Sequence, residues 1–555
     1  MANGIIDILN VIGNLLRFGV IPVYSQLKAD QISYLTILAA GFAGSSSAGL
    51  LVIYFRDKIR QIPLIFCRDH VIICGVHETA EVLVQQFRRE KTKTVVIGAL
   101  PQGSLEAENV RRYSTVMLEG DPKDGAILSL ARVKRAKALL ALTESDGINA
   151  EIALSTMNLL EKRKGTPLHC ILQISNPGLW KIIREKALSP NDWKTMRLDF
   201  YNGPALGARV LLKTYFTSFM DTLSSTPSLF IVVGAGRLGE SIIVRASREW
   251  FERNPSSVNL EILLVDLNAV AIKDRLLATY PHLSDRTTIH PFAIGVHSAE
   301  FQSARFLKER AAVSNVLAFV CLNDDTAGLN AALTLSHLLV GIPSKILVRM
   351  DHNPGLARLV ETNGKAAVQI IPYNSLSLAA RSDLVLGGII EVLARAIHDQ
   401  YLGTIPLQES VATSPAAVVW EALPERLKDA NRRQAEHILE KLRAVGCDVV
   451  PMTDWLATGF SFTPGEIEYL AEMEHIRWMD TMREQGFSFG PTRSEGEKTH
   501  PSMIPFHDLP EPEKEKDRET VRKIPRYLAL IDLQIYRPGG MTRGDEPCPE
   551  EMHCA

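Results

Sequence analysis

The chain has 555 residues, of which 46% are hydrophobic and 22% are charged, and this composition excludes a mainly disordered protein. A formal net charge of -2, with no basic and aromatic-laced stripe, gives no reason to expect a nucleic acid as partner. The seven cysteines are scattered without a CxxC pair, which argues against a disulfide framework. A chain of this length is expected to hold about three or four domains.

Two apolar segments open the chain. Residues 31–55 contain no charged residue, and 25 helical residues rising about 1.5 Å each would span roughly 37 Å. This predicts one transmembrane helix, although Ser45–Ser47 leave a buried helix of a soluble domain as the alternative. Residues 1–30 are apolar but contain Asp7 and Arg17, which predicts an amphipathic interfacial segment or a re-entrant one.

The charges around the predicted helix indicate its orientation. Arg56, Lys58, Arg60 and Arg68 all follow it, whereas only Lys28 closely precedes it. The positive-inside rule therefore predicts a single-pass protein of the inner or plasma membrane with a cytoplasmic C-terminal body. No TVGYG-like filter lies between the two apolar segments, so a potassium-selective pore of the usual kind is not predicted.

A glycine-rich motif follows a predicted strand in the stretch SLFIVVGAGRLG. Gly234 would allow a tight turn, Gly236 would let a phosphate approach the backbone, and Gly239 would let helix and strand pack closely. Arg237 and Leu238 begin the predicted helix, whose free N–H groups and dipole favour a phosphate.

The next predicted strand, LEILLVD, ends at Asp266, where a carboxylate is placed to accept hydrogen bonds from ribose hydroxyls. Its spacing from the glycines is longer than usual, and the polar insertion ERNPSSVN accounts for the difference. The predicted nucleotide site therefore consists of Gly234, Gly236, Arg237, Leu238, Gly239 and Asp266.

An earlier stretch, DHVIICGVHETA, follows the same plan in degraded form. It keeps Gly75, but His77 stands where the second glycine is expected and Ala80 where the third is expected. Its second strand ends in Gly98 and lacks the acid. Because His77 would place a side chain in the path of a pyrophosphate, the first copy is predicted to have kept the fold and lost ordinary dinucleotide binding.

The two copies continue alike, which indicates a duplication. The run at 147–150 (GINA) matches the run at 328–331 (GLNA), and the run at 176–179 (NPGL) matches its counterpart at 353–356. Alternating strand and helix patterns in each copy predict an α/β fold with two Rossmann-like, doubly wound parallel sheets.

These residues resemble the RCK, or TrkA-N, family of cytosolic domains that regulate potassium channels and transporters. The resemblance covers about 68–400, with a first domain at 68–222 and a second at 227–405. It implies pairing of the two units and a regulatory ligand, either NAD(H) or an adenine nucleotide. The resemblance rests on the glycines of the second copy, Gly120-Asp121, the run from Thr143 to Asn149, and Asp324, Asp325 and Asn330. The second copy has Gly295-Val296 where a second glycine–aspartate step is expected.

The C-terminal part begins after a Pro-, Ser- and Ala-rich linker at 406–420. Thr463 and Glu466 predict a capping box at the start of a long helix. Residues 415–537 resemble the ryanodine-receptor-type (RyR) domain, and 538–555 are predicted to be a flexible tail. The matching residues include Leu470-Ala471-Glu472, Arg477-Trp478, Gly486-Phe487, Phe489-Gly490, His500-Pro501 and Ile504-Pro505-Phe506.

The RyR resemblance implies a mainly helical module that packs or binds a nucleotide-like ligand near a cation channel. Its aromatic and basic residues would suit stacking of a base and pairing with a phosphate. The alternative is that the aromatic residues belong to the core. The predicted ligand pocket consists of His475, Arg477, Trp478, Phe487, Phe489 and His500. Phe487 and Phe489 replace the more usual Trp and Tyr.

Together these features predict a membrane-anchored, nucleotide-sensing regulator or minimal subunit of a potassium or other cation channel or transporter. A homo-oligomer, dimer or tetramer, is expected. One alternative is a membrane-permeabilising effector that a signal nucleotide activates during stress or phage defence. An NAD-dependent oxidoreductase is the other, but no catalytic acid–base constellation accompanies the glycine motif, so the protein is not expected to be an enzyme.

Overall fold

The structure is a computed structural model, and it describes Leu64 and residues 67–537 except 100–104, 162, 164, 187–194, 224–225, 254–257, 304, 309–313, 361–366, 405–415 and 495. The predicted transmembrane helix at 31–55, the segment 1–30 and the tail 538–555 lie outside the described residues. Within the described part, no helix is both long enough and apolar enough to cross a membrane.

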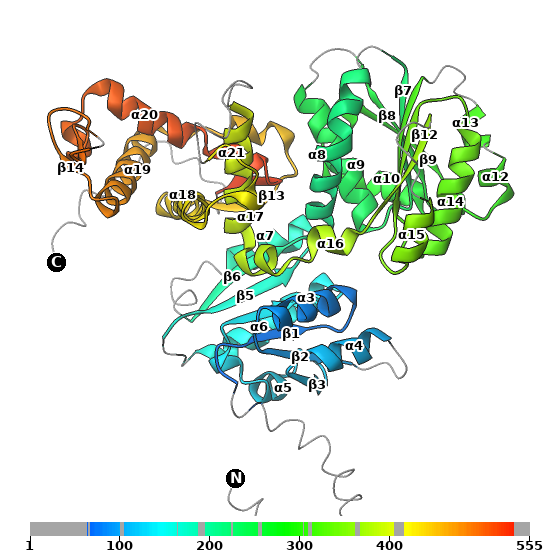
Figure 1. The fold of residues 1–555 in the computed structure, drawn as a ribbon, viewed down its shortest axis with the longest axis horizontal. Coiled ribbons are helices and arrows are strands. Elements are labelled where there is room, and N and C mark those ends of the chain that lie inside the picture. Colours follow the sequence, from blue (N-terminus) through cyan, green and yellow to red (C-terminus); the bar gives the residue numbers. More distant parts are fainter. Residues whose placement is uncertain are drawn as a thin grey trace, which may run out of the picture.

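The first unit is a parallel sheet of six strands in the order β3-β2-β1-β4-β5-β6, with helices on its faces (Figure 1). The central strand β1 pairs with both β2 and β4, so that Ile73 lies opposite Val96 and Leu140. The strands are β1 Val71–Cys74, β2 Thr94–Gly98, β3 Val116–Glu119, β4 Ala138–Ala141, β5 Leu168–Gln173 and β6 Met196–Tyr201. The helices are α3 Glu78–Arg89, α4 Leu105–Tyr113, α5 Gly125–Leu130, η2 Val133–Arg135, α6 Asp146–Leu160 and α7 Pro177–Lys186.

The second unit repeats this topology, because its sheet has the order β12-β11-β10-β7-β8-β9 with β7 in the place of β1. The predicted duplication is therefore visible as two sheets with equivalent strand orders. The strands are β7 Ser228–Val233, β8 Leu260–Val265, β9 Thr287–Phe292, β10 Asn315–Val320, β11 Ser344–Arg349 and β12 Val368–Tyr373. The helices are α9 Arg237–Arg253, α10 Ala269–Thr279, α11 Leu283–Arg286, α12 Ala299–Gln302, α13 Arg305–Lys308, α14 Asp325–Leu338, α15 Pro354–Val360 and α16 Ser375–Ala379.

The two units exchange helices. Helix α8 (Gly203–Leu223) follows the first sheet but packs beside α9 of the second unit, where Phe216 contacts Phe230 of β7 edge-on at 5.4 Å (Figure 1). Helix α17 (Ser382–Thr404) follows the second sheet, and its Leu393 and Ala394 are buried in the core of the first unit. The pairing that the RCK resemblance implies is thus present within one chain.

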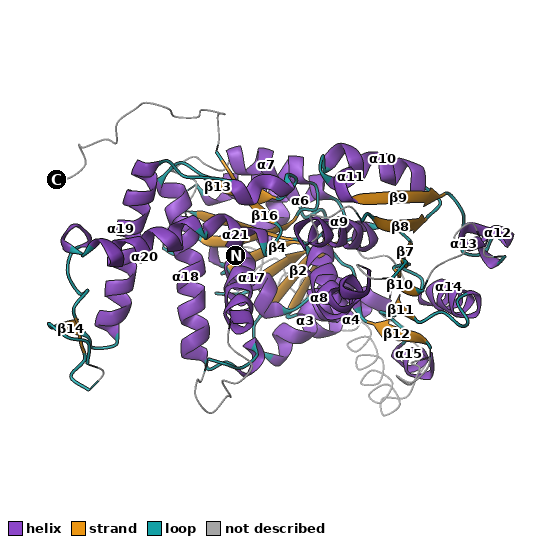
Figure 2. Ribbon diagram, turned by 90° about the horizontal axis from the view of Figure 1, so that it is seen from above, coloured by secondary structure: helices purple, strands orange, loops and turns teal. Residues whose placement is uncertain are grey.

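The C-terminal module is mainly helical, as predicted, and its capping box at Thr463 and Glu466 is present. Its elements are η4 Trp420–Ala422, α18 Glu425–Ala444, β13 Asp448–Pro451, η5 Trp455–Gly459, α19 Pro464–Glu484, β14 Ser488–Phe489, β15 Thr499–His500, η6 Phe506–Asp508, α20 Glu511–Arg522, α21 Ile524–Ala529 and β16 Leu533–Tyr536. Strands β13 and β16 pair antiparallel. Viewed from above, α17 and α18 lie between the first sheet and the pair α19–α20 (Figure 2).

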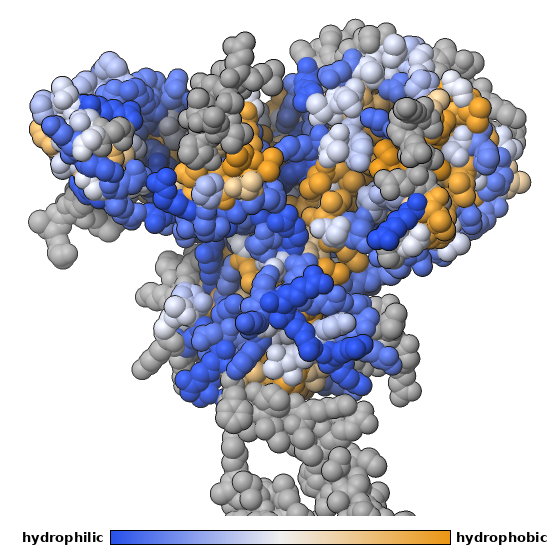
Figure 3. Space-filling view, viewed as in Figure 1, coloured by the Kyte–Doolittle hydropathy of each residue, from blue (hydrophilic) through white to orange (hydrophobic). Residues whose placement is uncertain are grey.

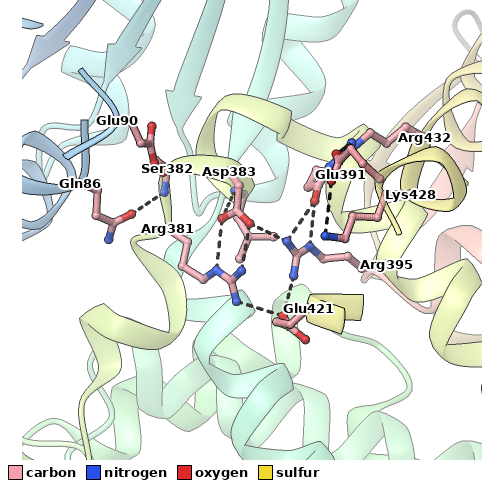
Figure 4. A network of polar contacts seen from close by, with 12 residues as sticks. Gln86, Glu90, Arg381, Ser382, Asp383, Glu391, Arg395, Glu421, Lys428 and Arg432 are labelled. Atoms are coloured by element: carbon pink, nitrogen blue, oxygen red, sulfur yellow. Dashed lines mark hydrogen bonds and ion pairs between the residues drawn. The ribbon is translucent and has the colours of Figure 1, made fainter. Parts of the chain in front are cut away.

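A polar network holds this module on α17. Figure 4 shows Arg395 pointing toward both Asp383 and Glu421, at 2.6 and 3.1 Å. The buried Glu391 accepts a hydrogen bond from Arg395 at 3.1 Å and another from Arg432 of α18 at 2.7 Å. One continuous apolar core runs from the first sheet into the module, so the module and the first unit are firmly joined.

Candidate functional site

The glycine turn after β7 has the geometry that the motif predicts. Gly234 adopts a φ of +83°, a region that favours glycine. A side chain on Gly239 would overlap the carbonyl oxygen of Gly234, so only glycine allows this approach of helix to turn. Around Gly236 the space is open for 4 Å, so its backbone is accessible to a bound group. Gly234 and Gly239 thus have the conformational roles expected of them, and the approach of a phosphate at Gly236 stays a prediction.

Asp266 lies directly after β8 and beside the glycine turn, as predicted. One of its carboxylate oxygens accepts a hydrogen bond from the backbone N–H of Ala235 at 2.9 Å, and the other accepts one from Asn268 at 2.8 Å. The half-buried carboxylate therefore braces the turn. Each oxygen keeps a further lone pair that a ribose hydroxyl can use.

The first helical residues of α9 have different roles. The side chain of Leu238 is buried, and its δ-carbon would lie 3.6 Å from a side chain on Gly207 of α8. Leu238 can therefore offer a ligand only its backbone N–H, which has no partner within the helix. The guanidinium of Arg237 reaches the first unit, where it donates to the carbonyl of Glu144 and lies 3.5 Å from Asp146.

Gly236 and Arg237 line a cavity of about 660 Å³ between the two units. The first unit contributes His77, Glu78 and Glu144, so the ends of both sheets face the same space. Asp266 does not line this cavity. A phosphate on the glycine turn would therefore face the first unit, and the carboxylate of Asp266 lies beside the same turn at Ala235.

Contacts across the cavity fix the two units to each other. Glu78 of α3 accepts a hydrogen bond from His352 at 2.7 Å and lies 3.9 Å from Arg349. Burial would lower the pKa of His352, but Glu78 and the neighbouring Asp325 outweigh it and raise that pKa. The motif analysis did not single out Glu78 or Glu144, because their partners lie 274 and 93 residues away along the chain.

In the first copy, His77 caps its own helix, α3. The ring of His77 accepts a hydrogen bond from the backbone N–H of Thr79 at 3.2 Å, and its other nitrogen contacts the carbonyl of Leu142. Burial lowers the pKa of His77. Its ring therefore satisfies a helix N–H that a ligand would otherwise use, and the loss of ordinary dinucleotide binding stays a prediction.

The matched acids after β4 and β10 are structural. Asp146 accepts hydrogen bonds from the backbone N–H groups of Ser175 and Asn176 at 2.8 Å, and Asp325 accepts them from the equivalent loop at 2.8–3.0 Å. Each acid is the first residue of its helix. Asp146 therefore aligns with Asp325, and the match of 147–150 with 328–331 is wrong in register.

The predicted RyR ligand pocket is only partly assembled. His475 is buried and its Nε2 donates a hydrogen bond to the carbonyl of Ile504 at 2.7 Å, while its ring stacks on Trp478 with centroids 5.5 Å apart. Trp478 in turn meets the ring of His500 edge-on at 5.0 Å. Burial opposes protonation of His475, but Asp517 and the Ile504 carbonyl outweigh it and raise its pKa.

The other three predicted residues do not converge on this stack. Arg477 donates to the buried Glu474 at 2.7 and 3.1 Å. Phe487 is buried beneath Lys498, whereas the side chain of Phe489 is 59% exposed. The core interpretation therefore holds for His475 and Phe487, and a ligand surface is limited to Trp478, Phe489 and His500.

Comparison with known proteins agrees with both resemblances. Residues 71–187 match the TrkA-N domain, and residues 465–537 match the RyR domain. The voltage-gated potassium channel Kch of Escherichia coli (strain K12) is 29% identical over 93 residues, which are 17% of this chain and 22% of Kch. Potassium channel protein 1 of Methanocaldococcus jannaschii is 28% identical over 111 residues, covering 19% of this chain and 32% of that protein. The chain thus spans about a third or less of these relatives.

Among solved structures, the GsuK channel bound to ADP matches with a TM-score of 0.38 and 16% identity, over 66% of this chain and 84% of that chain. The human SLO3 gating ring matches with a TM-score of 0.35 and 12% identity, over 56% and 80% of the two chains. The family matches confirm that this chain carries a TrkA-N domain in its first unit and a RyR domain at its C-terminal end.

Proposed function

We propose that this protein is a membrane-anchored, nucleotide-sensing regulator or minimal subunit of a potassium or other cation channel or transporter. The observation that carries the proposal is the glycine turn of the second unit, which combines an open approach at Gly236 with the close packing at Gly239. The TrkA-N domain and the two potassium-channel relatives support the regulatory setting.

The ligand of the second unit is an adenine nucleotide or NAD(H). The open space at Gly236 and the N-terminal dipole of α9 fit a phosphate, and the spare lone pairs of Asp266 fit a ribose. The bound nucleotide has a regulatory rather than a chemical role, so no turnover of NAD(H) is expected. NAD(H)-dependent product formation by the full chain would contradict this part of the proposal.

A pair of variants tests the site. Gly236→Asp keeps a residue that caps a helix well and adds a charge that repels a phosphate, so the free protein should fold normally. In the full chain in detergent, calorimetric titration should show at least tenfold weaker binding of ADP or NAD(H). Gly465→Asp places the same charge at the start of α19, where the space is also open, and should leave binding unchanged. Equal affinities of Gly236→Asp and wild type would refute the site.

Membrane anchoring by residues 31–55 and a homo-oligomeric body complete the proposal. Leu333, Val340 and Leu359 of the α14–α15 region are 37%, 75% and 82% exposed, and apolar surface gathers over the second unit in Figure 3. Such a patch is typical of an assembly surface. Light scattering of the full chain in detergent should show a dimer or tetramer, and Leu359→Glu should shift it toward monomer.

Ion flux separates the regulator from the membrane-permeabilising effector. A regulator in liposomes should change the flux of potassium or another small cation when ADP or NAD(H) is added. Release of a larger dye such as carboxyfluorescein under the same conditions would instead identify a permeabilising effector. The RyR domain would sense a second small ligand at the surface of Trp478, Phe489 and His500, and Trp478→Ala should remove that response.

A further inference from the structure

A second cavity lies where the two units and the C-terminal module meet. Its volume is about 400 Å³, within the range of small-molecule sites. The loops after β5 and β6, helices α8, α9 and α10, helix α17, and the β13 and β16 region of the module all contribute to its lining. Only Tyr201 and Arg237 also line the cavity at the glycine turn, so this is a separate site.

Three arginines converge on one carboxylate in this cavity. Arg245 and Arg248 of α9 contact Asp532 at 2.6 and 2.7 Å, and Arg209 of α8 lies 3.4 Å from it. We call Arg209, Arg245 and Arg248 the arginine cluster. Asp532 belongs to the RyR domain and stands on a turn between α21 and β16, where its φ of +60° is unusual for a non-glycine residue.

Several buried donors in the same lining have no acceptor within the described part of the protein. The indole N–H groups of Trp180 and Trp455 and the Nε of Arg209 are all buried in this way. Trp180 and Trp455 are 5% and 2% exposed. Buried donors are almost always hydrogen-bonded in proteins, so these three mark an unusually polar wall beside the arginine cluster.

Charge and shape narrow the ligand class. The arginine cluster carries three positive charges, and Glu249 pairs with Arg245 at 2.8 Å while Glu252 lies 3.3 Å from Arg248. Asp532 supplies the remaining negative charge, so an anion can enter only by replacing it. Guanidinium groups bind phosphate well, and the stacked rings of Trp180 and Phe200, 4.2 Å apart, give the same cavity an aromatic wall.

We propose that the arginine cluster binds the phosphate of a nucleotide, and that Asp532 is a built-in competitor which the nucleotide displaces. In the ligand-free arrangement, Asp532 ties the RyR domain to α8 and α9. Displacement breaks this tie while leaving the network on α17 intact. The junction thereby converts ligand binding into a movement of the RyR domain relative to the second unit.

Calorimetric titration of the full chain with ADP and with inorganic pyrophosphate tests this proposal. All variants carry Gly236→Asp, which removes binding at the glycine turn from the measurement. Asp532→Asn keeps a residue that tolerates positive φ and removes the competing charge, so both probes should bind at least tenfold more tightly. Arg209→Gln leaves the two shorter contacts of Asp532 in place and should weaken both probes at least tenfold.

Asp399→Asn is the matched control, because Asp399 forms an exposed ion pair with Lys213 of α8 at 2.7 Å, away from the cavity lining. It should bind the probes like its parent. ADP should bind more tightly than pyrophosphate if the aromatic wall holds the base, and equal affinities would overturn the nucleotide assignment. The proposed site would be refuted if Asp532→Asn, Arg209→Gln and the control bound the probes with the same affinity. It would also be refuted if none of them bound either probe. The comparison of Gly236→Asp with wild type reports on the glycine turn, whereas the comparisons among variants that all carry Gly236→Asp report on the arginine cluster, so either site can fail without the other.

Discussion

The non-helical backbone at Gly388, inside α17, predicts that an alanine there destabilises the protein. Gly388 adopts a φ of +57°, and its amide neighbour Ile389 donates to the buried Asp199 of β6 at 3.4 Å. A side chain at Gly388 would place its β-carbon 2.6 Å from the carboxyl carbon of Asp199. Real β-carbons essentially never approach another atom below 3.0 Å, so Gly388→Ala must move the carboxylate or the helix.

Two costs add up in this variant. The backbone of Gly388, with φ +57° and ψ -146°, lies in a region used almost only by glycine, which costs alanine about 1–3 kcal/mol. Displacing the carboxylate of Asp199 also weakens its 2.9 Å hydrogen bond from Phe200 and its contact with His169 at 3.5 Å, which adds about 1–3 kcal/mol. Gly388→Ala is therefore expected to lower the free energy of unfolding by about 2–6 kcal/mol.

Differential scanning calorimetry of the full chain measures this loss. A destabilisation of about 2 kcal/mol corresponds to a decrease in melting temperature of about 4 °C or more for the unit affected. Gly403→Ala is the control in the same helix, because the space around Gly403 is open and its alanine variant should be stabilised by about 0.5–1 kcal/mol. Equal melting temperatures of Gly388→Ala and wild type would refute the reasoning about Asp199.

Three further predictions follow from buried contacts. Gly239→Ala should lower the melting temperature and abolish nucleotide binding at the glycine turn, because its side chain overlaps Gly234. Asp448→Asn should destabilise the chain by about 3 kcal/mol in denaturant unfolding, because Arg184 then loses its carboxylate 3.6 Å away while both remain buried. The raised pKa of His475 adds stability that is complete below about pH 6.5 and is lost as pH rises through its folded value, so melting temperatures from pH 6 to 8 should fall. Asn in place of its partner Asp517 should flatten this profile.

Local features of the sequence predict the fold well. The central strands of the two sheets are short apolar runs, and the alternation of strands with helices predicts the parallel topology that the structure shows. The glycine turn is equally local, since Gly234, Gly236 and Gly239 act within six residues of chain. The degraded motif of the first copy is also local, although the sequence does not reveal that the ring of His77 caps its own helix.

Long-range packing is what the sequence does not reveal. Nothing in the pattern of α8 or α17 indicates that each covers the partner unit, because both helices are apolar enough to pack on either sheet. The contact of Arg209 with Asp532 joins residues 323 positions apart. A local signal was available for His475, which follows the buried Leu470, Ala471 and Glu474 at helical spacing and so belongs to the core face of α19.

The attachments of the C-terminal module explain why the junction is a suitable point of control. The module meets the first unit through a continuous apolar core and the buried pair of Arg184 with Asp448, and neither contact can open without a large loss of stability. The module contacts α8 and α9 through the ion pairs of Asp532. The side chain of Asp532 is 27% exposed, and the arginines that it contacts also line a cavity. An anion can therefore replace Asp532 at the arginine cluster more readily than it can disrupt the apolar core or the pair of Arg184 with Asp448. In the proposed regulator, the C-terminal module therefore stays bound to the first unit. It loses or regains the contact of Asp532 with the second unit, which carries the glycine turn.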